Sequence, residues 1–97
     1  MARTLRVVVV DDQLPFRIAL VERVNPDVVV LDMRMPGMDG PTAARVIAER
    51  WPSVAVVLCS SHSRDDLPVE LAAPFVPKEL LTAAVLQDAV REHANRL

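Results

Sequence analysis

Uninterrupted apolar runs alternate along this chain with segments in which apolar residues recur every three or four positions. A continuous apolar run of this kind is typical of a parallel strand that is buried on both faces of its sheet. Three such runs predict strands over residues 5–10, 27–31 and 54–59. Residues 74–77 predict a brief fourth strand, in which the two prolines cannot donate to a sheet ladder.

The segments between the runs predict helices with one apolar face, over residues 14–24, 41–50 and 80–97. Pro15 and Pro41 suit the first turn of a helix, and the first helix should end at Asn25 because Pro26 follows it. Strands that alternate with helices favour an α/β fold with a doubly wound parallel sheet. Right-handed connections then place the carboxyl ends of all strands at one edge.

Chemically capable side chains stand at the ends of the predicted strands. In chain order they are Asp11, Asp12, Asp32, Ser60, Ser61 and Lys78. Clustered carboxylates suit Mg²⁺, which prefers one or two carboxylates together with waters and phosphate oxygens. With Mg²⁺ bound, Asp32 can act as a nucleophile toward phosphorus. Lys78 offers a positive charge and Ser60 a hydroxyl donor for the phosphoryl oxygens.

Each of these residues also has an ordinary structural interpretation. The acidic pair at 11–12 can cap the next helix, Asp32 or the serine pair can belong to a turn, and a lone lysine is usually a surface charge. His62 is better explained as a loop residue than as a metal ligand, because no second His or Cys lies at ligand spacing. The joint placement at strand ends favours a site, and no single residue does.

Composition narrows the class of protein. Ninety-seven residues, 52% of them hydrophobic, suit a single domain over 1–97 with its own core. The sequence has no apolar run of about eighteen residues and no signal-peptide pattern, so we expect a cytoplasmic protein without membrane contact. A net charge of −2, no basic cluster and three aromatic residues argue against direct nucleic-acid binding. The one cysteine, Cys59, lies in an apolar run and should be buried.

Four motifs resemble those of the response regulator receiver domain, the module that a sensor histidine kinase phosphorylates in two-component signalling. They are V-V-V-V-D-D at 7–12, V-L-D-M-R-M-P-G-M-D-G at 30–40, L-C-S-S-H at 58–62 and F-V-P-K at 75–78. The resemblance extends from residue 6 to about residue 97, and L-D-x-x-M-P-x-x-D-G is specific almost by itself. It implies a flavodoxin-like receiver fold with the strand order 2-1-3-4-5.

The resemblance also implies a role for each matching residue at the strand ends. Asp32 matches the phosphoacceptor. Asp11 and Asp12 match the acids that bind Mg²⁺ together with Asp32 and the backbone carbonyl of Arg34. Lys78 matches the lysine that pairs with the phosphate.

The mechanism implied by the resemblance is a conformational switch. A phosphoryl group passes from a phosphohistidine of the kinase to Asp32, after which Ser60 moves inward and Phe75 turns. Side chains at the positions of Arg34 and His62 tune dephosphorylation in the family. Such a domain catalyses only its own phosphorylation and dephosphorylation and is not otherwise an enzyme. Its expected outputs are transcription regulation and a receiver homodimer through the last two strands and helices.

One departure from the family pattern is large. A receiver has a further strand and helix before the acceptor strand, but residues 5–32 number only 28, and one strand-helix-strand unit needs about thirty. The second strand and its helix are therefore missing near residues 24–25. Either the chain has lost them, or the sequence joins residues on either side of an omitted segment. The survival of every site position around the gap favours the second explanation.

A direct connection across this gap would change the topology. A right-handed crossover would place helix 14–24 on the face of the sheet opposite to its position in the family. The helix from residue 80 onward would then be less covered. The first strand would become a valine-rich edge that is prone to pair with another chain.

Two other functions stay open. The segment between Ser60 and Phe75 is shorter than in the family, and with the missing strand it motivates a degenerate receiver that binds a partner regardless of phosphorylation. A phosphatase with an aspartyl intermediate is disfavoured. Such an enzyme needs a second acid close after the nucleophile, and position 34 is Arg.

Overall fold

The helices and strands lie close to their predicted bounds in the structure, a computed structural model that describes residues 4–10, 18–33, 40–60 and 73–97. In chain order they are β1 (Val7–Val10), α1 (Ile18–Val24), β2 (Val28–Asp32), α2 (Gly40–Arg50), β3 (Ala55–Ser60), β4 (Phe75–Pro77), the short 3₁₀ helix η2 (Lys78–Leu80) and α3 (Ala83–Arg96). The four predicted strands and three predicted helices are confirmed, although the first four residues predicted for α1 lie outside the described residues.

The strands form one parallel sheet in the order β1-β2-β3-β4. The register pairs Val10 with Leu31 and Asp32 with Cys59, and it pairs Ser60 with Pro77. The carboxyl ends of all four strands therefore meet at one edge of the sheet, as the sequence predicts.

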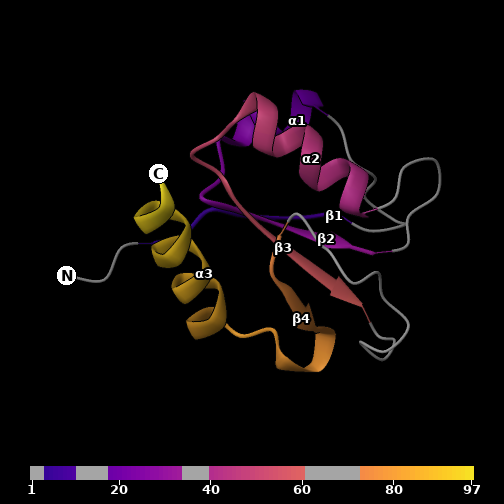
Figure 1. Cartoon of the computed structure of the whole chain (residues 1–97), viewed down its shortest axis with the longest axis vertical. Helices are drawn as coiled ribbons and strands as arrows, with labels where there is room; N and C mark the ends of the chain where they lie inside the picture. The colour runs from indigo at the N-terminus through magenta and orange to yellow at the C-terminus, as the bar shows by residue number, and fades with distance from the viewer. Residues whose placement is uncertain (1–3, 11–17, 34–39, 61–72) are drawn as a thin grey trace.

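Helices α1 and α2 cover one face of the sheet, and α3 covers the opposite face (Figure 1). Leu20 and Val24 of α1 pack against the same buried cluster that contains Ala44 and Ile47 of α2. The two connections step across the sheet in the same direction, so right-handed crossovers put both helices on one face. This is the outcome expected if β1 connects directly to the acceptor strand.

The position of α1 leaves part of the other face uncovered. In β1, Val8 and Val10 are buried in the cluster under α1 and α2, whereas Val7 and Val9 are 38% and 49% exposed. Helix α3 contains no buried residue and packs on Val28, Ala55 and Val57, which belong to β2 and β3. The predicted valine-rich edge strand is therefore present.

Two helix ends have identifiable local causes. Helix α1 ends at Asn25, which lies in the left-handed region with a φ of 51° and donates its N–H to the carbonyl of Val21 at 2.9 Å. The prediction that the last helix begins at residue 80 was wrong, because η2 intervenes. Helix α3 begins at Ala83, since the Thr82 hydroxyl accepts a hydrogen bond from the N–H of Val85 at 3.2 Å and caps it.

Candidate functional site

Asp32 is the last residue of β2, and it stands where the buried part of that strand gives way to solvent. Residues 28–31 are buried on both faces of the sheet, while the Asp32 side chain is 18% exposed. A fully buried strand thus holds a carboxylate at its open carboxyl end, which is where ligands bind in open parallel sheets.

Lys78 forms an ion pair with this carboxylate. Its Nζ atom lies 3.1 Å from Oδ2 of Asp32, and its side chain is 48% exposed. The pairing of Ser60 with Pro77 brings the end of β4 to the edge, and Lys78 is the next residue. Lys78 is also the only lysine among the eleven basic residues of the sequence. The structure therefore brings together two of the predicted site residues, from β2 and from the turn that follows β4.

Ser60 ends β3, the strand between β2 and β4, and is 2% exposed. The register places its neighbour Cys59 beside Asp32, so Ser60 lies one position beyond the acid at the same edge. Phe75 opens β4 opposite Leu58 and is half-buried against the cluster beneath α1 and α2. Asp32, Ser60 and Lys78 thus share one sheet edge, and Phe75 lies further down the neighbouring strand.

Sequence reasoning missed the role of Gly40, which it gave only as the last residue of the motif at 30–40. A Cβ atom on Gly40 would lie 2.5 Å from the carbonyl oxygen of Asp32, and the Gly40 N–H donates to the carbonyl of Met33 at 3.2 Å. The first turn of α2 therefore packs directly on the backbone of the acid. The signal in the sequence was a glycine immediately before Pro41, at the start of a helix.

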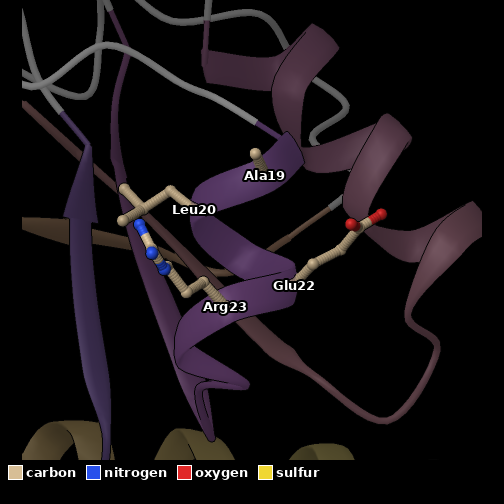
Figure 2. Close-up of a pocket in the computed structure, with 4 residues that line it drawn as sticks. All are labelled: Ala19, Leu20, Glu22 and Arg23. Atoms are coloured by element: carbon tan, nitrogen blue, oxygen red, sulfur yellow. The ribbon is translucent and has the colours of Figure 1, made fainter.

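A cavity of about 360 Å³ lies beside the ion pair on the α3 face of the sheet. Its described lining residues are Val9, Val10, Val30, Asp32, Cys59, Lys78, Leu81 and Leu86. A larger hollow of about 480 Å³ lies along α1, and none of its described lining residues, Ala19, Leu20, Glu22 and Arg23, is a predicted site residue (Figure 2). The smaller cavity is therefore the one that adjoins the ion pair between Asp32 and Lys78. Its apolar wall is the area of sheet that α1 leaves uncovered.

Of the four predicted metal ligands, Asp32 lies within the described residues. The others, Asp11, Asp12 and Arg34, lie outside the described residues, as does His62. Within residues 4–10, 18–33, 40–60 and 73–97, no three His, Cys, Asp or Glu side chains gather in a metal-binding group. The half-open Asp32 carboxylate is a hard oxygen ligand of the kind that Mg²⁺ prefers, and β1 ends at Val10 beside Leu31, at the same edge. The donor chemistry fits Mg²⁺.

Comparison with known proteins identifies the family. A family model described as the response regulator receiver domain matches residues 3–90. The chain belongs to this family. Its fold is the flavodoxin-like receiver fold, with four parallel strands in the described residues. For example, the response regulator domain of Thermotoga maritima CheB superimposes with a TM-score of 0.64 at 20% identity, over 96% of this chain and 98% of that one.

Two curated relatives show the proteins in which similar receivers occur. Protein-glutamate methylesterase/protein-glutamine glutaminase 6 of Anaeromyxobacter dehalogenans is 39% identical over 90 residues, covering 67% of this chain and 26% of that protein. Transcriptional regulatory protein DegU of Brevibacillus brevis is 31% identical over 74 residues, covering 72% of this chain and 31% of that protein. The chain thus spans about a third or less of the length of either relative.

Membership in this family assigns the chain to two-component signalling. Receiver domains of such systems interact with histidine kinases and generally use Mg²⁺ in their phosphorylation. Among the helices that the structure describes, none combines the length and the apolar character needed to cross a lipid bilayer.

Proposed function

We propose that this receiver domain accepts a phosphoryl group from a histidine kinase onto Asp32 and changes its surface in response. The observation that carries the proposal is the 3.1 Å ion pair between Asp32 and Lys78, at an edge that also holds Ser60. A carboxylate that is 18% exposed is accessible to a donor, and a lysine already in contact with it can follow the charge after transfer.

The transfer is a displacement at phosphorus. A carboxylate oxygen of Asp32 attacks, the P–O bond forms while the P–N bond of the phosphohistidine breaks, and the imidazole keeps the electron pair and takes a proton from solvent. Asp32 would hold Mg²⁺ together with Asp11, Asp12 and the carbonyl of Arg34, and the ion would supply positive charge to the phosphoryl oxygens. Lys78 then pairs with a phosphoryl oxygen instead of Oδ2.

Ser60 and Phe75 carry the conformational response in this proposal. The Ser60 hydroxyl donates to a phosphoryl oxygen, and the resulting shift at the end of β3 reaches Phe75 through the β3–β4 ladder, in which Leu58 pairs with Phe75. Side chains at positions 34 and 62 set the lifetime of the phosphorylated state. The output is a partner protein or a homodimer through the last two strands and helices, in a cytoplasmic system that regulates transcription. The domain acts on no substrate besides its own phosphoryl group.

A phosphorylation-independent interaction module is the second candidate. The observation that favours it is the uncovered apolar area around Val7, Val9 and the neighbouring cavity. A partner that recognises this area would need no change at Asp32.

Intact mass spectrometry distinguishes the two candidates. The protein is incubated with Mg²⁺ and a small phospho-donor, and we expect a gain of one phosphoryl group on the 10.7 kDa chain. Asp32→Asn should abolish the gain, whereas Asp88→Asn, which changes an exposed acid on α3, should not. Absence of the gain in the unaltered protein would support the interaction module, and release of many phosphates per chain would indicate an enzyme.

A further inference from the structure

The backbone groups of alternate β1 residues face away from β2, along the outer edge of the sheet. The carbonyl of Arg6 accepts hydrogen bonds from the N–H groups of Asp27 and Val28, at 2.9 and 3.3 Å. Along a strand, successive residues turn their backbone groups to opposite sides, so Arg6, Val8 and Val10 face β2. The N–H and C=O groups of Val7 and Val9 therefore point away from the sheet. Among the described residues, β2 is the one strand that pairs with β1.

The same two residues carry the exposed side chains of the strand. Val7 is 38% and Val9 is 49% exposed, on the face opposite to the buried Val8 and Val10. Outward backbone groups and exposed valines thus coincide on two alternate residues. This combination is a template for strand addition, because one partner strand can both hydrogen-bond to the outward backbone groups and cover the exposed valines.

The other edge of the sheet is protected in the way that edge strands usually are. Strand β4 has only three residues and ends with Pro77, which has no N–H to offer. Strand β1 has four valines, with no proline and no charged side chain within it. The unprotected edge is therefore the one that the direct connection from β1 to β2 has created.

We propose that β1 pairs with β1 of a second copy of this chain, antiparallel, about a twofold axis at Val8. In this register Val7 lies opposite Val9 of the second copy, and Val9 opposite its Val7. Each of these two pairs exchanges both N–H···O=C bonds, so all the outward groups of both strands are used. The exposed valines of the two copies then pack on each other on one face, and the two four-stranded sheets become continuous.

Both geometry and charge select the antiparallel arrangement. A parallel pair related by a twofold axis along the strands would turn the exposed valines of the two copies to opposite faces. It would also set the two Val10 ends side by side, each followed in the sequence by Asp11 and Asp12. Antiparallel pairing instead brings Arg6, which is exposed and precedes the strand, beside Val10 of the other copy. The edge is thus complementary to itself, which favours a second copy over an unrelated strand.

Sedimentation velocity over a concentration series tests the pairing. We expect a species of about twice 10.7 kDa for the unaltered protein. Val9→Lys should weaken the dimer by about tenfold or more, because the twofold axis applies the change twice. Leu80→Lys makes the same change at a residue that is 57% exposed near the opposite edge, and it should leave the dimer intact. A monomer at every concentration, or a dimer lost only with Leu80→Lys, would refute the proposal.

Disulfide trapping tests the register independently of the lysine variants. Residues in a hydrogen-bonded antiparallel pair have Cα atoms about 5.5 Å apart, within the range of about 4.4–6.8 Å that a disulfide needs. A mixture of Val7→Cys and Val9→Cys chains should therefore give a crosslinked heterodimer under mild oxidation, and each variant alone should give much less. Equal crosslinking of Val7→Cys or Val9→Cys with itself would rule out this register.

The proposed pairing does not depend on phosphorylation. Asp32→Asn should abolish the phosphoryl gain and leave the sedimentation behaviour unchanged, so the two proposals can fail separately. A dimer that is lost in Asp32→Asn would show that the interface is not the β1 edge alone, against this proposal.

Discussion

Gly40 lies so close to the backbone of Asp32 that a Cβ atom at residue 40 would stand 2.5 Å from the Asp32 carbonyl oxygen. It would also stand 3.0 Å from Cα of Met33. These are backbone atoms, which cannot rotate away as the end of a long side chain can. The N-terminus of α2 therefore fixes the position of the strand end that carries Asp32. Only a residue without a side chain allows so close a contact at position 40.

Gly40→Ala should therefore destabilise the protein, although alanine is the better helix former. The added methyl group must displace either α2 or the end of β2, which corresponds to an overpacking cost of about 1–3 kcal/mol in the free energy of unfolding. Urea unfolding measures this change. Glu49→Ala, at an exposed position of the same helix, is the matched control and should change stability by less than about 0.5 kcal/mol. A stabilised Gly40→Ala variant would mean that the helix can move without cost.

The ion pair between Lys78 and Asp32 predicts that the Lys78 amine reacts more slowly than it would without Asp32. Lys78 is the only lysine in the sequence, so an amine-reactive reagent can modify only this side chain and the N-terminus. Its side chain is 48% exposed but held 3.1 Å from the carboxylate. Asp32→Asn should accelerate the modification of Lys78, read by mass spectrometry of peptides. Asp88→Asn, which alters an exposed ion pair on α3, should leave the rate unchanged.

If Lys78 were labelled faster in both variants, the cause would be the general loss of negative charge and not the loss of the ion pair with Asp32. An unchanged rate in Asp32→Asn would contradict the ion pair. The N-terminal amine serves as an internal reference in the same digest, because its rate should be equal in all three proteins.

Much of the site could be predicted from the sequence, because the carboxyl ends of parallel strands share one edge. This rule brings Asp32, Ser60 and Lys78 together without knowledge of any contact. The face on which α1 lies followed from chain length and the handedness of crossovers. The contact of Gly40 with Asp32 could not be predicted, since it depends on how closely a helix approaches a strand, and no periodic pattern records that distance.

The start of α3 illustrates a different limit of sequence reasoning. The apolar pattern extends back to Leu80, but a local hydrogen bond at Thr82 decides where the helix begins. Thr82→Ala should lower the free energy of unfolding by about 1 kcal/mol, because the N–H of Val85 loses its acceptor. Thr82→Ser keeps the hydroxyl and should retain most of the stability. Equal losses in both variants would show that the threonine methyl group matters rather than the cap.

The placement of α1 beside α2 can be tested through one pair of surface charges. Glu22 of α1 reaches toward α2 (Figure 2), and its Oε1 atom lies 3.4 Å from the guanidinium of Arg50. Both side chains are about half exposed, so a double-mutant cycle with Glu22→Ala and Arg50→Ala should give a coupling of about 0.2–1 kcal/mol that falls as salt is added. If α1 lay on the α3 face instead, the two residues would be separated by the sheet and their effects would add. A cycle of Glu22 with Arg96, which lies on α3, is the matched control: the observed topology predicts coupling only with Arg50.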